Sequence, residues 1–174
     1  GPEGLNYLDI LSVVSKQAIK DCEAKISLNE HLDTISVIRF VGDTPNRDSA
    51  TTDFWGYSNM PRSLGNSLGV SVPNEIYTTT GGNSPQLVLN EICNRIKDGQ
   101  INCALLSGGE ALDTFISRVK GGKDVVWGDD PGGEPESIGS LKDGATEFEQ
   151  NHGIFDPSSV YPLFANRIRA NERK

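Results

Sequence analysis

Long apolar runs are absent from this sequence. No stretch of the 174 residues approaches the roughly 20 apolar residues that a helix needs to cross a bilayer, and no pattern typical of a signal peptide is present. Histidine is nearly absent, with His31 and His152 alone, so chemistry that relies on a histidine base has two candidates. We therefore expect a cytoplasmic protein with no membrane span.

Cysteine is also scarce, and its spacing matches no metal motif. The chain has an odd number of cysteines, namely Cys22, Cys93 and Cys103. Their spacing is not that of metal ligands, and no zinc signature is present. The first two fall in predicted helices and the third in a predicted strand. We expect buried, reduced thiols, as in a cytosolic protein, and no metal site.

An excess of positive charge is missing as well. The chain has 16 Lys and Arg against 24 Asp and Glu, which gives a net charge of −8. Non-specific nucleic-acid binding needs a dense basic face, so we do not expect it. A basic cluster near the C-terminus could form a local patch, but a solvated helix end whose cations suit the helix dipole is favoured. The cluster comprises Arg167, Arg169, Arg173 and Lys174.

What the sequence does contain is an alternation of helix and strand patterns. A hydrophobic content of 36% allows a core. Apolar spacing predicts helices, and apolar or β-branched runs predict strands, in the order α-β-α-β-α-β. Their ranges are 5–25, 34–41, 61–68, 75–80, 85–98 and 101–107. This order implies an α/β fold with a parallel sheet and helices on its faces.

A polar loop over residues 42–59 contains three aromatic residues, Phe54, Trp55 and Tyr57. These rings either pack on a partner or another domain, or they anchor the loop on its own domain. The sequence favours neither interpretation.

The character of the chain changes after residue 116. Residues 120–146 are rich in Gly, Pro and acidic residues, which is typical of a lid, a binding loop or a disordered segment. Helical patterning returns over 158–172, with Pro162 expected at the helix start. We therefore divide the chain into an α/β core, 1–116, and a loop or lid region, 117–174. Four acids in this region could bind a hard cation, although a solvated acidic loop is favoured; they are Asp129, Asp130, Glu134 and Glu136.

The stretch 77–86 joins a strand to a helix through two glycines. Gly81-Gly82 is followed by Asn83 or Ser84 as a helix N-cap and by Pro85 in the first turn. Such an elbow binds an anion at the helix N-terminus or presents a nucleophile. It is not a Walker loop, a GxGxxG loop or a GxSxG elbow.

Two sets of residues are candidates for chemistry. Ser84 could act as a nucleophile with His152 as its base, but turn glycines with an N-cap are the favoured interpretation. Gly108-Gly109-Glu110 ends a predicted strand, where ligands bind in open α/β sheets. Glu110 could bind a substrate or orient a catalytic group. Alternatively, the two glycines let chain segments pass closely while Glu110 hydrogen-bonds locally, and both interpretations stay open.

The stretch TTTGGNSPQLVLNEICNRIKDGQINCALLSGGEALDT, from Thr78 to Thr114, resembles the N-terminal half of the thiolase superfamily. The similarity is to its acetyl-CoA acetyltransferase and sterol-carrier-protein-thiolase-like branch. GDDPGGEPE (128–136) and NHGIFDPSSVYPLF (151–164) are similar to that branch too. The resemblance implies a half-fold with a mixed sheet, paired with a second similar half, and an acyltransferase of lipid metabolism that uses coenzyme A thioesters. The strand that precedes the helix at 5–25 in that family is missing.

The resemblance also implies a nucleophilic cysteine at the N-terminus of the elbow helix, and that position is Gly82. A second cysteine and one or two histidines come from the other half in that family. Cys93 lies eleven residues further on, about three helical turns away, and cannot substitute. An acyl-enzyme mechanism needs a thiolate, so Claisen-type acyl transfer is not expected of this chain alone.

The resemblance thus implies a thiolase-like protein that handles acyl-CoA or CoA, with the thioester as substrate and no separate cofactor. Its partner would be a second copy in a homodimer, or a second thiolase-like half. The alternative is a non-catalytic assembly module that uses residues 77–86 and the aromatic loop 54–57 as its surface. The residues expected to bind substrate are Gly81, Gly82, Asn83, Ser84, Glu110, His152 and Tyr161.

Overall fold

The computed structural model describes residues 5–43, 55–122, 127–140, 144–154 and 156–172. The chain divides into two compact units, Gly1–Ser140 and Leu141–Lys174. The sequence predicts a division after residue 116, whereas residues 127–138 stay with the first unit, because they pair with its strands. No helix among the described residues is long and apolar enough to cross a membrane.

The first unit is built on a parallel three-stranded sheet. Its strands are β1 (Thr34–Val37), β3 (Asn74–Tyr77) and β4 (Ala104–Ser107), in the order β3-β1-β4. Val37 lies opposite both Tyr77 and Ser107. The three carboxyl ends therefore reach the same edge of the sheet.

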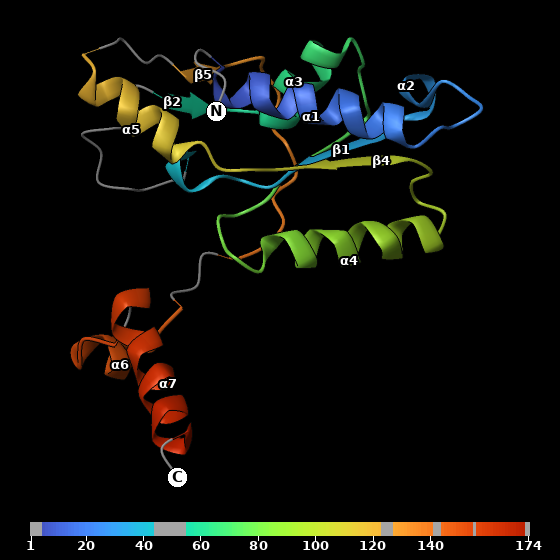
Figure 1. Cartoon of the computed structure of the whole chain (residues 1–174). Helices are drawn as coiled ribbons and strands as arrows, with labels where there is room; N and C mark the ends of the chain where they lie inside the picture. Colours follow the sequence, from blue (N-terminus) through green and yellow to red (C-terminus); the bar gives the residue numbers. More distant parts are fainter. Residues whose placement is uncertain (1–4, 44–54, 123–126, 141–143, 155, 173–174) are drawn as a thin grey trace. The chain divides into compact units, whose positions relative to one another are not determined.

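Helices cover both faces of this sheet. Figure 1 shows α1 (Tyr7–Asp21) and α3 (Met60–Leu68) on one side and α4 (Ser84–Lys97) on the other. The core against α1 and α3 contains Tyr7, Leu11, Ile35, Val37, Met60, Leu64 and Tyr77, and the core under α4 contains Ile76, Val88, Ile92 and Ile101. The α/β fold and the parallel order predicted from the sequence are confirmed. The resemblance implied a mixed sheet, whereas every strand pair among the described residues is parallel.

Local sequence explains where these helices begin and end. Asn6 and Asp9 form a reciprocal capping box at the start of α1, with Asp9 N–H donating to Asn6 Oδ1 at 2.8 Å. Asn59 caps α3, which ends at Gly69 in the left-handed region, at φ 74°. The remaining short elements are α2 (Leu28–His31), a 3-10 turn η1 (Val41–Asp43) and α5 (Leu112–Lys120).

Part of the segment expected to be a lid is instead attached to the first unit. β5 (Trp127–Asp129) pairs in parallel with β2 (Trp55–Tyr57). Further on, the N–H groups of Tyr77 and Thr79 donate to the carbonyls of Glu136 and Ile138, both at 2.9 Å. Residues 136–138 therefore extend the sheet beyond β3 and cover its edge.

The acids of this segment are bonded to protein groups. Ser63 Oγ donates to Asp129 at 2.8 Å, and Ser58 Oγ donates to Asp130 at 2.6 Å. The guanidinium of Arg95 on α4 holds both oxygens of Glu136, at 2.7 and 2.6 Å. No group of three or more His, Cys, Asp or Glu in the described part of the chain could hold a metal. Asp129, Asp130 and Glu136 therefore fasten the segment through hydrogen bonds, while they and Glu134 stay exposed to solvent, as expected of a solvated acidic loop.

The second unit contains α6 (Glu147–Asn151) and α7 (Pro157–Glu172). The prediction that Pro162 starts the last helix is wrong, since Pro162 lies inside α7 and Pro157 begins it. Pro157 suits the first turn, where a missing N–H costs no helical bond. Of the C-terminal basic cluster, Arg173 and Lys174 lie outside the described residues.

The expectation of buried thiols is wrong for two of the three cysteines. Cys22 and Cys93 are exposed, and Cys103 is half-buried. Cys22 lies at the C-cap of α1, and Cys93 is on the outer side of α4, because Val88 and Ile92 occupy the side that faces the sheet.

The aromatic loop is anchored on its own unit through Tyr57. Tyr57 is 4% exposed, and its ring centroid lies 6.3 Å from that of Tyr7. Phe54 and the side chain of Trp55 lie outside the described residues. For Tyr57 the structure therefore favours the second of the two interpretations of this loop.

We predict that Glu136 protects the edge of β3. The hydrogen bonds from Arg95 hold the pKa of Glu136 below its ordinary value. The ion pair is therefore intact above about pH 4.3 and is lost as pH falls through the lower pKa of the folded state. At pH 7, Glu136→Gln should speed amide exchange at Tyr77 and Thr79 about 1.5- to 5-fold, the range for partly exposed ion pairs.

The matched control for this prediction is Glu134→Gln, which makes the same charge change on an exposed side chain two residues earlier. Its exchange rates should equal those of the unchanged protein. The difference caused by Glu136→Gln should shrink as pH falls below about 4.3 and be lost once pH has passed through the lowered folded-state pKa of Glu136. Equal rates for the two variants at pH 7 would contradict the assigned role of the ion pair.

Candidate functional site

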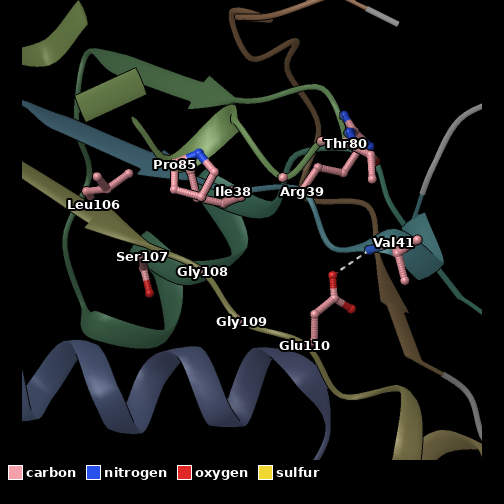
Figure 2. Close-up of a pocket in the computed structure, with 12 residues that line it drawn as sticks. Ile38, Arg39, Val41, Thr80, Pro85, Leu106, Ser107, Gly108, Gly109 and Glu110 are labelled. Carbon is pink, nitrogen blue, oxygen red and sulfur yellow. Dashed lines mark hydrogen bonds between the residues drawn. The ribbon is translucent and has the colours of Figure 1, made fainter. Parts of the chain in front are cut away.

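A cavity of about 640 Å³ opens at the carboxyl ends of the three strands. Its lining comes from three segments that follow or end those strands: Ile38 to Val41, Thr80 to Pro85 and Leu106 to Glu110 (Figure 2). The chain leaves β1 towards the layer of α1 and α3, and it leaves β3 towards α4 on the opposite face. Connections that diverge in this way open a crevice at the strand ends, where ligands bind in open α/β sheets.

The elbow after β3 supplies the glycines of this cavity. Asn83 is the N-cap of α4 and Pro85 lies in its first turn, as predicted, but the Asn83 side chain makes no capping hydrogen bond, so that part of the prediction is wrong. Ser84 is 2% exposed, and its hydroxyl donates backwards to the carbonyl of Thr79 at 2.8 Å. The hydroxyl therefore fastens the turn. Gly81 and Gly82 line the cavity, whereas Asn83 and Ser84 are not among its lining residues.

Gly82 has space for a side chain that it does not carry. A Cβ atom built on Gly82 would meet nothing within 4 Å, and Gly82 has no left-handed φ that would oppose a side chain. At Gly81 a Cβ would lie 2.9 Å from Asn83 Oδ1 and 3.3 Å from Ser84 Oγ. The backbone N–H of Gly82 has no acceptor among the described residues. The position thus combines open space with an available hydrogen-bond donor.

Gly108 is required for the close approach of β1 and β4. A Cβ on Gly108 would lie 2.7 Å from Cβ of Ile38, closer than real side chains approach. Gly109, the next residue, has open space around the same position. At Gly108, therefore, the interpretation that glycine lets two segments pass closely is correct.

Glu110 joins two strand ends across the cavity. Its Oε1 accepts a hydrogen bond from the N–H of Val41 at 2.9 Å, drawn as a dashed line in Figure 2. This bond spans 69 residues in sequence, so it is not the local bond considered from the sequence. The structure brings Glu110 to the same cavity as Gly81 and Gly82.

The two remaining predicted site residues belong to the second unit. His152 Nδ1 lies 2.7 Å from the carbonyl oxygen of Phe148 in α6, and Tyr161 is an exposed residue of α7. Every lining residue of the cavity comes from the first unit. Ser84 and His152 each have a hydrogen-bond partner in their own unit.

Arg39, Asp43 and Tyr77 form a network beside the cavity that was not predicted from the sequence; Tyr77 is buried, and Arg39 and Asp43 are partly buried. The guanidinium of Arg39 lies 3.7 Å from the Tyr77 ring centroid, and it donates to the backbone carbonyl of Thr78 at 3.0 Å and to Asp43 Oδ2 at 3.1 Å. The hydroxyl of Tyr77 also donates to Asp43. A charged pair spaced four residues apart, directly after a buried strand, is the sequence signal for this network.

Burial controls the charge states within this network. It raises the pKa of Asp43 above its ordinary value, although the Tyr77 hydroxyl and the Arg39 charge act in the opposite direction. Burial also raises the pKa of Tyr77 far above its usual range, so this phenol stays protonated and donates. Arg39 is the one Lys or Arg among the lining residues of the cavity.

The lining residues set limits on the chemistry of the cavity. Ile38, Val41, Pro85 and Leu106 provide apolar surface, and Glu110 is the one carboxylate among the lining residues. None of the three cysteines and neither histidine belongs to this lining. The site as described is therefore suited to binding a partly apolar small group, and no cysteine lies in it to act as a nucleophile.

Comparisons with known proteins give no relative for this chain. No protein-family model matches it, and neither the curated proteins nor the solved structures contain a match.

We predict that position 82 accepts a side chain that position 81 rejects. In a background with Cys22→Ser and Cys93→Ser, Gly82→Cys should leave the free energy of unfolding within about 0.5 kcal/mol, as at unstrained sites. Gly81→Cys should lower it by about 1 kcal/mol, because the exposed Asn83 side chain can turn away whereas the buried Ser84 hydroxyl cannot. Urea denaturation measures both values, and alkylation of the native proteins should modify Cys at 82. Equal destabilisation by the two substitutions would contradict the described turn.

We also predict that adjacent glycines differ in their tolerance of alanine. Gly108→Ala should destabilise the protein by about 1 to 3 kcal/mol, because the added methyl group separates β1 from β4. Gly109→Ala should be neutral or stabilise by up to about 1 kcal/mol, through the lower entropy of the unfolded chain. Urea unfolding of the pair measures the difference, and a neutral Gly108→Ala would contradict the close contact with Ile38.

Proposed function

We propose that this chain is a thiolase-like protein that binds acyl-CoA or CoA in the manner of the acetyl-CoA acetyltransferase family. One observation carries the proposal. Gly82 lines the cavity at the strand carboxyl ends, at the position where the resemblance requires the reactive cysteine. A side chain at position 82 would have open space around it, and a nucleophile needs such space.

The convergence of two separated motifs supports the proposal. The elbow residues Gly81 and Gly82 and the strand-end residues Gly108 to Glu110 are more than 20 residues apart in sequence, yet they line one cavity. Both motifs belong to the stretch that resembles the thiolase superfamily. If other segments had lined the cavity, these two motifs would give the proposal no support.

The proposed role follows from the chemistry that the lining allows. In the covalent mechanism of the family, a thiolate attacks the thioester carbonyl, the acyl group moves to the protein sulfur, and the CoA thiolate leaves and takes up a proton. With Gly82 in place of the cysteine, that bond to the protein cannot form at this position. In our proposal the N–H of Gly82 donates to the thioester carbonyl, and Ile38 and Leu106 pack against the acyl chain.

Exposed apolar residues on α4 favour a second candidate, the non-catalytic assembly module. Leu87, Leu89 and Ile96 are 40%, 43% and 44% exposed, on a helix that begins at the elbow. In this proposal the elbow and α4 pack against a second thiolase-like half, and the cavity has no ligand of its own. The two candidates differ in whether CoA binds.

We predict that 1 mM acetyl-CoA or CoA raises the melting temperature of the chain. With a dissociation constant near 0.1 mM, binding adds about 1.4 kcal/mol to the free energy of unfolding. This corresponds to about 3 to 6 °C for a chain of this size. Gly82→Leu should abolish the shift by filling the cavity, whereas Gln86→Leu, which adds an apolar side chain at an exposed position outside the lining, should preserve it.

The absence of a shift at 1 mM would refute CoA binding by this chain and favour the assembly module. A second readout tests the position of Gly82. In the background without Cys22 and Cys93, Gly82→Cys incubated with acetyl-CoA should acquire an acetyl group, detected by mass spectrometry. Gly109→Cys, a second lining position with open space, provides the comparison, and equal acetylation of the two would contradict the assignment of Gly82.

A further inference from the structure

The end of α1 and the start of β4 each carry a cysteine. Cys22 is the C-cap of α1, and Cys103 directly precedes β4. Figure 1 shows the last turn of α1 and the first residues of β4 at the same end of the sheet, away from the cavity. Both thiols are free in this structure.

Two hydrogen bonds fix the direction in which α1 crosses the sheet. Near the start of the helix, the hydroxyl of Tyr7 donates to the carbonyl of Ile38 at 3.3 Å, just beyond the carboxyl end of β1. Further along the helix, Ser15 Oγ donates to Ser107 Oγ at 3.3 Å, at the last residue of β4. The helix therefore runs from the carboxyl ends of the strands towards their amino ends, and Cys22 lies further in that direction.

The spacing along both elements places the two cysteines opposite each other. Cys22 follows Ser15 by two helical turns, so the two residues share a face of α1 and lie about 10 Å apart along its axis. Cys103 precedes Ser107 by an even number of residues, so both point to one side of the sheet, about 13 Å apart. Cys103 packs against the core that lies under α1. Both steps lead from the contact between the two serines towards the same point.

The ionisation of Cys103 agrees with this placement. Burial, the charge of Asp33 and the charge of Cys22, in that order, raise the pKa of Cys103 above its ordinary value. Since a neighbouring charge shifts a pKa over short distances, the two sulfur atoms lie near each other. Cys22 is exposed and Cys103 is half-buried. A dissolved oxidant therefore meets Cys22 first.

We propose that Cys22 and Cys103 form a reversible disulfide when a low-molecular-weight disulfide, such as oxidised glutathione, reaches Cys22. A disulfide needs Cα atoms within about 7 Å of each other. Cys22 caps α1, and helix ends fray, so the last turn can adjust to that distance. Neither cysteine lines the cavity, so this thiol pair and CoA binding can succeed or fail independently.

The reaction consists of two exchange steps. The Cys22 thiolate attacks one sulfur of oxidised glutathione, the S–S bond of glutathione breaks, and one glutathione leaves as a thiolate and takes up a proton. Cys103 then loses its proton to solvent, its thiolate attacks the Cys22 sulfur, and the second glutathione leaves in the same way. The two cysteines lose two electrons and two protons in total, and oxidised glutathione becomes two glutathione thiols.

Two variants of the full chain provide matched pairs of thiols. Cys93→Ser keeps Cys22 with Cys103, whereas Cys22→Ser keeps Cys93 with Cys103. Each variant thus has one exposed cysteine besides Cys103, but Cys93 lies on α4, which covers the opposite face of the sheet from α1 (Figure 1). Each native protein is treated with oxidised glutathione at low protein concentration, quenched with acid, digested with trypsin and analysed by mass spectrometry without reductant.

Cys93→Ser should lose both thiols without retaining glutathione, and trypsin should release residues 21–25 linked to residues 98–118. Cys22→Ser should retain glutathione on Cys93. The ratio of linked peptide to glutathione adduct should be at least about tenfold higher in Cys93→Ser, through the effective concentration of a neighbouring thiol. Equal ratios in the two variants, or a glutathione adduct that persists on Cys22, would overturn the proposal.

Thermal unfolding tests whether the bond fits the native fold. A disulfide that closes a loop of about 80 residues constrains the unfolded chain, so oxidised Cys93→Ser should melt about 4 to 16 °C above its reduced form. Reduction with dithiothreitol should reverse the rise. An unchanged or lower melting temperature of the oxidised form would overturn the proposed pairing.

Discussion

The parallel pairing of β1 with β3 and β4 is the constraint on which the first unit depends. It brings three carboxyl ends to one edge, with Val37 opposite Tyr77 and Ser107. The pairing with β4 is close enough that only glycine fits at position 108 against Ile38. Since every lining segment of the cavity follows or ends one of these strands, the position of the cavity is a consequence of the sheet.

The hydrogen bonds around the cavity involve backbone groups of the loops that line it, and they fix the conformation of these loops. Glu110 holds the turn after β1 through the N–H of Val41, and Ser84 holds the elbow through the carbonyl of Thr79. Arg39 packs on Tyr77 at the cavity edge. These bonds maintain the shape of the site even though Gly82 offers no reactive side chain. A binding role needs that shape alone, whereas covalent catalysis needs a nucleophile in addition.

Much of the first unit could be predicted from its sequence. The order of helices and strands, the parallel sheet and the glycine at the end of α3 follow from periodicity and turn chemistry, which act over a few residues. The exposure of Cys93 could not be predicted, because it depends on which side of α4 meets the sheet. The segment 136–138 was also missed, since its strand pairing is set by β3 and Arg95 and not by its own composition.

Some features of the candidate site were likewise set by the sequence alone, and others only by the tertiary structure. The sequence alone determined the elbow at Gly81-Gly82, the strand end at Glu110 and the absence of a cysteine at position 82, since these depend on residue identity and local turn chemistry. Only the tertiary structure decided that these two motifs line one cavity and that Arg39 lines it with them. The physical reason is that sheet pairing joins segments far apart in the chain, and its register is set by packing across the whole sheet.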